Sequence, residues 1–429
     1  MSTLKVNKLR DTAGSADAIT LDPNGGAVLA GVTTVTSVKV GAAVTISESG
    51  IEASGIGITC ANINGTQISG RRNIIINGAM NIAQRGTSST SSGMNSVDRF
   101  AVNFSGTDEA PTQAQVTLSS SDTPYSSGFR YALKITNGNQ TSGGGAADYV
   151  QIVQKIEAQD MAGSGWNYTS SSSNITLSFW VKSSVAQTMY ARLNAEDASR
   201  AFSFAFSATT SWTKIIKTIP GNSNLVFNND NGVGIALYFI PFYGTNYTTS
   251  DHTNDAWITD SSSNQVTDMT TTWYTTNDAT FEVTGVQLEV GSQATAFEHR
   301  SYGEELDLCT RYCQVMTSNA TSERINFANV VVHGAGNGVY IMVGLLPMRT
   351  APSVTTEGSF QASVITGGWT ATNVSSITSE FTTANGNDKT TWGYDGMLSA
   401  SIADSCTVGL SGQIFSSSGF GQFVFSAEL

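Results

Sequence analysis

The sequence predicts an all-β protein with a thin oligomeric N-terminal β stalk, a central antiparallel jelly-roll sandwich, a short linker helix and a smaller C-terminal β domain. First, apolar residues alternate with polar or small residues in many short segments, and no long segment repeats at the helical period. Second, charged residues make up only 13% of the 429 residues, about half of the roughly 25% usual, which excludes long charged helices. Third, 42 glycines and frequent Ser and Asn clusters supply turns between the alternating segments.

Residues 1–72 are predicted to form the stalk. The first seventy residues contain no Trp, Tyr or Phe, so this segment cannot build a core of its own. Short β-like runs recur in it between turn residues, namely Ala18–Leu21, Val32–Val40, Val44–Ser47 and Ile56–Cys60. Because a few short strands without aromatic residues are only marginally stable alone, we expect them to intertwine with identical copies of the chain. A flexible N-terminal arm is the alternative.

Residues 73–300 are predicted to form the sandwich, which is the largest domain. Its clearest strands place large apolar residues at alternate positions, as in Ile175–Val181, Phe202–Phe206, Ile235–Phe239 and Phe281–Val290. In the last of these strands the alternation changes phase at Gly285, which predicts a β-bulge there. We expect the alternating apolar side chains, Phe281 and Leu288 among them, to lie on the inward faces of the two sheets.

One helix is predicted, over the linker 301–316. Ser301 and Glu304 have the spacing of a capping box, and Leu308 and Tyr312 then recur at helical spacing. The helix would join the two β domains.

Residues 317–429 are predicted to form the C-terminal β domain. Apolar residues alternate again over Val339–Leu345, and the chain closes with Phe420, Phe423 and Phe425 in a Gly- and Ser-rich, strand-like segment. Because exposed strand edges invite aggregation, we expect these last apolar strands to be covered by neighbours.

Composition and charge exclude several classes of protein. The 33 acidic and 21 basic residues give a formal net charge of −12, and an acidic chain without a basic patch is not expected to bind nucleic acid. The longest apolar run, Val233–Tyr243, is far shorter than the ~18 residues that cross a bilayer, so we expect no membrane insertion. The spacing of Cys309 and Cys313 fits neither a zinc site nor a redox motif, and we expect reduced thiols.

Sequence motifs for catalysis and cofactor binding are absent. The chain has no G-x-S-x-G, H-E-x-x-H or G-x-x-x-x-G-K-[ST] pattern, and the glycine-rich Gly334–Gly338 leads into a strand instead of a helix. The three histidines, His252, His299 and His333, are well separated in the sequence. We therefore expect no cofactor, no histidine-based metal site and no catalytic residue, so that the protein is not predicted to be an enzyme. Calcium bound by scattered loop oxygens stays open.

The loop from Gly244 to Thr280 is the most site-like segment. It combines aromatic and acidic residues with Thr and Asn, and we predict from it the carbohydrate-binding residues Tyr247, Trp257, Trp273, Tyr274, Asp251 and Asp255. Flat rings provide apolar area with little rotamer entropy, and Asp and Asn form hydrogen bonds with sugar hydroxyls. In the alternative, the rings cap the core and the carboxylates are solvated. Asp251, Asp255 and Asp260 could also supply the carboxylate pair of a glycoside hydrolase.

Several stretches resemble one family. They are NIIINGAMNIAQRG at 73–86 with SVDRF at 96–100, GVQLEVG at 285–291 with AFE at 296–298, and LPMRTAPSV at 346–354. The first two resemble the opening and the closing of the carbohydrate-binding-module-like domain in tail fibres of tailed phages, and the third resembles the start of their C-terminal domain. VTISESGIEASG at 44–55 is similar to repetitive fibre segments of phages of marine cyanobacteria. The loop Gly244–Thr280 has no counterpart in this resemblance.

The resemblance implies a virion structural protein that is usually a homotrimer. Its N-terminal segment would attach to other phage tail proteins and its distal part would face the host, so we expect it in the virion tail, assembled in the host cytoplasm. We therefore predict a receptor-binding tail fibre protein that binds host cell-surface polysaccharide without cleaving it. A tail spike depolymerase using an Asp/Glu pair and a non-binding structural or decoration protein of the virion are the alternatives.

Overall fold

The computed structural model describes residues 8–9, 19–21, 27–29, 37–40, 44–47, 50–53, 71–318, 326–333, 338–365, 369–379, 395–402 and 411–429. The chain divides into two compact units, residues 1–61 and residues 62–429. The first unit holds two small antiparallel sheets, made of β1 Lys8–Leu9, β2 Ile19–Leu21 and β3 Ala27–Leu29, and of β4 Ser37–Val40, β5 Val44–Ser47 and β6 Gly50–Ala53. The expected run Ile56–Cys60 lies outside the described residues, and the oligomeric stalk stays a prediction.

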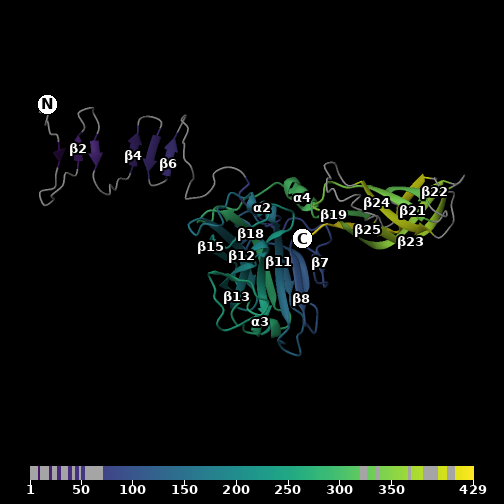
Figure 1. Ribbon diagram of the computed structural model, residues 1–429, viewed down its shortest axis with the longest axis horizontal. Coiled ribbons are helices and arrows are strands. Elements are labelled where there is room, and N and C mark those ends of the chain that lie inside the picture. The colour runs from purple at the N-terminus through teal and green to yellow at the C-terminus, as the bar shows by residue number, and fades with distance from the viewer. Residues whose placement is uncertain are drawn as a thin grey trace. The chain divides into compact units, whose positions relative to one another are not determined.

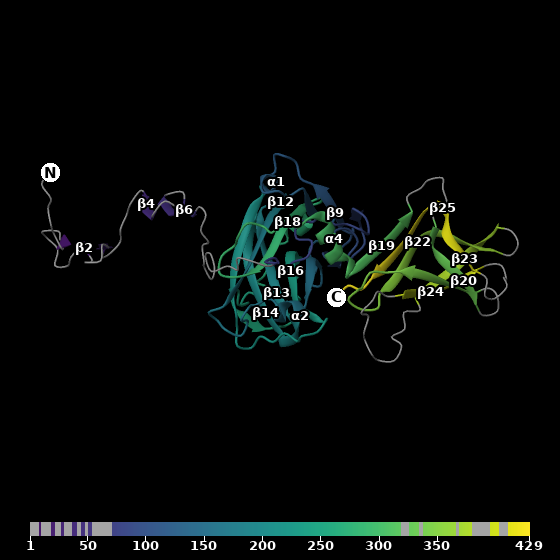
Figure 2. The ribbon, with the colours of Figure 1, turned by 90° about the horizontal axis from the view of Figure 1, so that it is seen from above.

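Two six-stranded sheets form the β-sandwich of the second unit (Figures 1 and 2). The first sheet has the order β15-β12-β18-β10-β9-β7, with β7 Ser88–Ser89, β9 Thr112–Thr117, β10 Tyr131–Thr136, β12 Asn174–Ser183, β15 Thr213–Pro220 and β18 Thr280–Val290. The second has the order β17-β14-β13-β16-β11-β8, with β8 Ala101–Ser105, β11 Tyr149–Glu157, β13 Gln187–Ala195, β14 Arg200–Ala208, β16 Val233–Tyr243 and β17 Trp257–Thr259. All strand pairs are antiparallel, which confirms the predicted sandwich.

The inward faces of both sheets form the core, as the alternation predicts. Figure 2 shows β12 and β18 in one layer and β13, β14 and β16 in the other. The ring of Phe179 from the first sheet lies 5.3 Å from the ring of Phe206 and 4.8 Å from that of Phe239 in the second sheet, centroid to centroid. Phe281 and Leu288 are fully buried in the same core, so their predicted inward placement is confirmed.

The predicted bulge at Gly285 is present in β18. Ser178 of β12 pairs with Gln287, whereas Trp180, two residues later, pairs with Thr284, so that β18 carries one extra residue. Gly285 has φ +62°, and a Cβ atom there would lie 2.6 Å from the ring of a phenylalanine that packs on the outward face of the sheet. Glycine is required at this position, because any other residue would be strained at this positive φ and its Cβ atom would clash with the ring.

A second bulge, which the sequence did not predict, interrupts β16. Val150 of β11 pairs with Phe242, and Ile152 pairs with Phe239. The two phenylalanines both point into the core although they are three residues apart. Residues on either side of this pair, including Tyr238 and Tyr243, therefore share the outward face of the sheet.

The described residues contain only short helices, namely α1 Thr123–Ser126, α2 Ala158–Ala162, the 3₁₀ turn η1 Glu196–Ala198, α3 Thr272–Thr275 and α4 Tyr302–Thr310. None of them is long and apolar enough to span a bilayer. At the start of α4 the capping box is confirmed, because Glu304 N donates to Ser301 Oγ (3.3 Å) and Ser301 N donates to Glu304 Oε2 (3.1 Å). The prediction of a helix over 301–316 was too long.

Helix α4 ends earlier than predicted because the residues that follow it form a strand. Cys313–Ser318 forms β19, which pairs with the last strand, β25, along its whole length. These main-chain hydrogen bonds between segments distant in sequence override a weak helical periodicity.

The strands of the C-terminal domain form one antiparallel sheet in the order β19-β25-β20-β21-β24-β23-β22, drawn in green to yellow in Figure 1. Their bounds are β20 Asn326–His333, β21 Gly338–Gly344, β22 Ser353–Ile365, β23 Trp369–Ser379, β24 Asp395–Ile402 and β25 Ser411–Ser426. Pairing of β22 with β25 closes the sheet on itself around a core that contains Ile341, Phe423 and Phe425. The apolar strand at the end of the chain is thus covered by its neighbours.

A buried carboxylate links the sandwich to the segment after α4. Arg311 donates two hydrogen bonds to Glu157, of 2.7 and 2.8 Å, and the Tyr312 hydroxyl donates a third of 2.5 Å. Burial alone would raise the pKa of Glu157, but the hydrogen bonds from Arg311 and Tyr312 outweigh it and lower the pKa. The guanidinium of Arg99 stacks 3.4 Å from the centre of the Tyr312 ring and pairs with Glu428.

We expect Glu157→Gln to lower the free energy of unfolding by about 2 kcal/mol at pH 7, because hydrogen bonds to a charged group contribute about 1.5–3 kcal/mol. Since folding lowers the pKa of Glu157, its stabilisation is fully present above about pH 5 and is lost as the pH falls through the folded-state pKa. Denaturant melts of wild type and variant should therefore differ at pH 7 and converge at acidic pH. The exposed Glu357→Gln is the matched control and should change stability by less than about 0.5 kcal/mol. An equal loss at both pH values would contradict the assignment.

Candidate functional site

A cavity lined mainly by tyrosines opens on the outward face of the second sheet. We call it the tyrosine cavity; its volume is about 320 Å³, and its lining residues are Tyr149, Gln151, Tyr238, Tyr243, Tyr247 and Gln265. Two of them come from β11, two from β16 and two from the segment 244–271 that follows β16. Neighbouring strands and a covering loop therefore build the site together.

Three of the rings contact one another, and Tyr149 meets the other two nearly edge to face. The ring centroid of Tyr149 lies 6.4 Å from that of Tyr243, at 88°, and 5.7 Å from that of Tyr247, at 86°; the last two rings are 5.4 Å apart. The Tyr243 hydroxyl donates to the side-chain oxygen of Gln151, and the Tyr247 hydroxyl donates to the main-chain oxygen of Ala147 at 3.3 Å. Such edge-to-face packing and hydrogen bonding hold the rings in defined orientations.

The segment 244–271 is fastened over the sheet by its own backbone. Tyr247 N donates to Gly244 O (3.0 Å), and Gln265 N donates to Tyr247 O (2.9 Å). Beneath the segment, Val266 is buried against Ile240 of β16. These contacts fix Tyr247 and Gln265 against the strand residues that form the rest of the cavity.

The tyrosine cavity is electrically neutral. No Asp, Glu, Lys or Arg lines it. Burial raises the pKa of Tyr243, and it also raises the pKa of Tyr238, against the opposing effect of Arg192, whose guanidinium carbon lies 5.6 Å from the Tyr238 ring centre. Both phenols therefore stay protonated at physiological pH, and the Tyr243 hydroxyl donates a hydrogen bond to Gln151.

A second cavity, of about 330 Å³, follows the tyrosine cavity along β11. Tyr149 and Gln151 line the first cavity, and the next outward residues, Val153 and Lys155, line the second. From Tyr149 to Lys155 the strand covers roughly 20 Å. Lys155 Nζ donates to the main-chain oxygen of Leu429 at 2.9 Å, which closes the far end. The outward face of β11 thus offers an extended surface with a tyrosine-rich end.

The six residues predicted to bind sugar divide into three groups in the structure. Tyr247 lines the tyrosine cavity. Trp257, Trp273 and Tyr274 are buried, the last two with 0% of their area exposed. Their polar atoms are also engaged, since Trp257 Nε1 donates to Pro220 O (2.7 Å) and Trp273 Nε1 donates to Thr280 O (3.0 Å). These three rings pack in the core instead of facing a ligand, and we leave them out of the proposed site.

Asp251 and Asp255 form the third group and are exposed. Asp251 accepts a hydrogen bond from Thr249, and this bond lowers the pKa of Asp251. Asp255 pairs with Lys217, and Asp260, the third acidic residue considered for catalysis, pairs with Arg192. Each carboxylate is thus engaged by a different partner, and neither Asp251 nor Asp255 lines the tyrosine cavity.

A serine, a histidine and an asparagine that are far apart in sequence meet on the second sheet. Ser203 Oγ lies 2.5 Å from His252 Nε2, and His252 Nδ1 lies 2.6 Å from Asn264 Oδ1. This order matches the nucleophile, base and orienting group of some hydrolases. However, Ser203 is only 2% exposed and His252 only 8%, so the segment 244–271 covers these side chains, and their hydrogen bonds fasten the segment to β14. Sequence spacing gave no sign of this contact.

Sequence reasoning missed most of the tyrosine cavity. The signal for Tyr149 and Gln151 is present, because they occupy alternate positions of a strand whose other positions, Val150 and Ile152, are aliphatic. No such signal exists for Tyr238 and Tyr243, because strict alternation places residues five apart on opposite faces and only the bulge in β16 brings them together.

The described residues contain no group of three or more His, Cys, Asp or Glu side chains arranged to hold a metal. Cys309 and Cys313 are buried free thiols, and burial raises the pKa of both. Cys60 and Cys406 lie outside the described residues.

Comparison with known proteins adds structural likenesses only. No protein-family model matches the chain. No curated protein sequence matches it either. Among solved structures, it is similar to the enzymatically active domain of tailspike protein 4 from bacteriophage CBA120, at 9% identity over 51% of this chain and 21% of that chain, with a TM-score of 0.28.

Two further similar structures are carbohydrate-binding modules. One is the family 11 module of a cellulosomal cellulase from Clostridium thermocellum, at 12% identity over 50% of this chain and 98% of that chain, with a TM-score of 0.24. The other is a module in complex with β-1,4-galactotriose, at 9% identity over 51% of this chain and 99% of that chain, with a TM-score of 0.26. Because these values are low, we base the proposed function on the residues of the tyrosine cavity.

Proposed function

We propose that the protein binds a host surface glycan through the tyrosine cavity, as a trimeric tail fibre protein of a tailed phage, and that it does not cleave the glycan. The observation that carries the binding proposal is the cavity itself, in which four tyrosines and two glutamines gather on the outward face of a sheet without any charged residue.

The chemistry of this lining suits uncharged sugar units. Sugars present apolar C–H faces and a rim of hydroxyl groups, and tyrosine rings offer flat apolar area to the former. Phenol hydroxyls and glutamine amides both donate and accept hydrogen bonds, as sugar hydroxyls do. The surface continues along β11 for roughly 20 Å beyond Tyr149, which leaves room for more than one unit of a polymer.

The tail fibre part of the proposal rests on the sequence resemblance. The opening and closing stretches of that resemblance are hydrogen-bonded to each other, since Asn73 Nδ2 donates to Val286 O (3.1 Å) and Leu288 N donates to Asn73 Oδ1 (3.0 Å). The proposal of a trimer rests on the aromatic-free segment 1–72. Three linked copies of a weak site gain roughly 10²- to 10⁴-fold in avidity when all can bind at once.

Binding without cleavage is supported by the contacts of the two acidic residues that the sequence singled out in the segment after β16. A glycosidase needs one carboxyl group with a raised pKa close to a second carboxylate. The pKa of Asp251 is instead lowered by its hydrogen bond from Thr249, and Asp255 is held in an ion pair with Lys217. These contacts support binding without cleavage.

The test uses the purified full-length protein and polysaccharide isolated from the host surface. We expect the protein to bind the polymer and to leave its length distribution, measured by size-exclusion chromatography, unchanged after prolonged incubation. Asp251→Asn and Asp255→Asn should retain wild-type binding.

Two outcomes would replace the proposal. Shortening of the polymer that is abolished by either Asp substitution would identify a depolymerase. Virions that lack the protein but adsorb normally to host cells would indicate a structural or decoration protein.

A further inference from the structure

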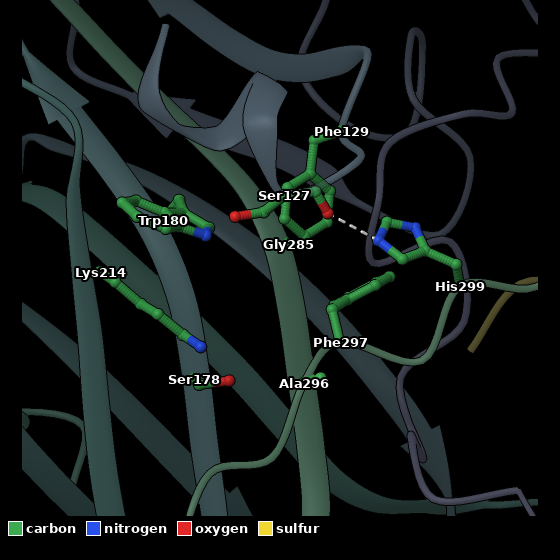
Figure 3. Close-up of a pocket in the computed structure, with 9 residues that line it drawn as sticks. All are labelled: Ser127, Phe129, Ser178, Trp180, Lys214, Gly285, Ala296, Phe297 and His299. Carbon is green, nitrogen blue, oxygen red and sulfur yellow. Dashed lines mark hydrogen bonds between the residues drawn. The ribbon is translucent and has the colours of Figure 1, made fainter. Parts of the chain in front are cut away.

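The first sheet carries a cavity on its outward face whose chemistry differs from that of the tyrosine cavity (Figure 3). Its volume is about 290 Å³. We call it the Trp180 pocket; Ser178, Trp180 and Lys214 line it from the sheet, and Phe297 and His299 line it from the segment that follows β18.

The sheet register explains how the pocket forms. Trp180 of β12 lies directly beside Lys214 of β15, and both side chains are on the outward face. The bulge at Gly285 passes between Trp180 and the segment with Phe297, as Figure 3 shows. Gly285 lines the pocket with its backbone, and the ring of Phe129 packs directly against it.

Charge distinguishes this pocket within an acidic protein. None of its nine lining residues is Asp or Glu, although the chain has a net charge of −12. Lys214 is exposed, and no ion pair joins it to any carboxylate in the described part of the chain. By contrast, nearby lysines are neutralised, since Lys182 approaches Asp122 and Glu282, and Lys217 pairs with Asp255. An unpaired ammonium group in a concave site attracts an anion.

Hydrogen-bonding groups also line the pocket. The indole N–H of Trp180 has no partner among the described residues, whereas the indole N–H groups of Trp212 and Trp273 both donate hydrogen bonds. In Figure 3 the Trp180 nitrogen lies on the side of its ring that faces Gly285. His299 Nε2 is already engaged, because it donates to Ser127 O at 2.9 Å (Figure 3).

We propose that the Trp180 pocket binds one sugar unit that carries a carboxylate, such as a uronic acid. The carboxylate lies against the ammonium group of Lys214, the apolar face of the sugar ring lies on Trp180, and the indole N–H binds a polar group of the sugar. A volume near 290 Å³ is at the small end for ligand sites, which fits a single unit. The pocket lies on the sheet opposite the tyrosine cavity, so this proposal does not depend on glycan binding there.

The test follows the indole N–H signal of Trp180 by NMR. Full-length protein labelled with ¹⁵N-tryptophan has seven indole groups, and the signal lost in Trp180→Phe identifies the one in the pocket. We expect glucuronate to shift this signal saturably and glucose to bind at least about tenfold more weakly, because glucose lacks the charge-assisted contact. Raising NaCl from about 0.05 M to about 0.5 M should weaken the binding of glucuronate but not that of glucose.

Substitutions at lysines give the matched comparison. Lys214→Met should weaken glucuronate binding about tenfold, and Lys214→Arg should retain most of it. Lys182→Met, on the same outward face but outside the pocket, should leave it unchanged. An oligogalacturonate used in parallel distinguishes a unit within a polymer from a free uronate, and binding of either supports the proposal.

Three results would overturn the proposal: equal binding of glucose and glucuronate, unchanged glucuronate binding by Lys214→Met, or an equal response to acetate. The last result would show that the pocket binds any small anion and does not recognise a sugar.

Discussion

Tyr247→Ala weakens the binding of an oligosaccharide from the host glycan by roughly 30-fold at each site, because removing an aromatic anchor from a binding surface costs about 2 kcal/mol. If the protein is the trimer that we propose, its adhesion to host cells falls further, since the weaker site also loses part of an avidity gain of roughly 10²- to 10⁴-fold. Tyr247→Phe keeps the ring and should retain most of the binding. Isothermal titration calorimetry measures the first effect, and a cell-adhesion assay measures the second.

The control for this prediction is Tyr302→Ala. Tyr302 is 64% exposed on α4 and lines none of the three cavities, so its removal should leave binding unchanged. Sedimentation of each sample should give a mass near three chains, which excludes a loss of avidity through dissociation. Wild-type affinity in both Tyr247→Ala and Tyr149→Ala would show that the glycan binds elsewhere, and a monomeric wild type would contradict the trimer.

Phe281→Ala or Leu288→Ala lowers the free energy of unfolding by about 2–5 kcal/mol, the largest effect on stability that we expect from a single substitution here. Both side chains are fully buried in the sandwich core. Truncation to Ala therefore loses the free energy gained by burying the apolar side chain, and it also leaves a cavity that the surrounding strands cannot fill.

Chemical denaturation monitored by circular dichroism measures this loss. Ile216→Ala is the matched control, because Ile216 is an apolar strand residue of the same sheet that is 53% exposed, and its truncation should change stability by less than about 0.5 kcal/mol. Similar losses at Phe281 and Ile216 would contradict the inward and outward faces assigned here.

Strand positions and inward faces of the sandwich could be predicted from the sequence. Alternation in Ile175–Val181 and in Phe202–Phe206 records which side of each strand is buried, and the structure confirms both. The bulge at Gly285 was predictable for the same reason, since the alternation changes phase there. These features are local, because a strand repeats every two residues whatever it pairs with.

The length of α4 was not predictable in this way. The capping box set where the helix begins, but β19 replaced its predicted second half by pairing with β25, more than 100 residues later in the chain. A local pattern cannot report a strand partner that is distant in sequence.

The same distinction between local pattern and distant pairing applies to the tyrosine cavity. The sequence by itself determined that aromatic and acidic residues gather in the segment after β16, and one of them, Tyr247, lines the tyrosine cavity. Only the tertiary structure decided which rings are exposed, because Trp273 and Tyr274 lie among Thr, Asn and Asp residues as Tyr247 does, yet are buried in the sandwich core. The bulge in β16 then set Tyr238 and Tyr243 on one face, an outcome that depends on how β16 pairs with β11 and not on the residues of β16 alone.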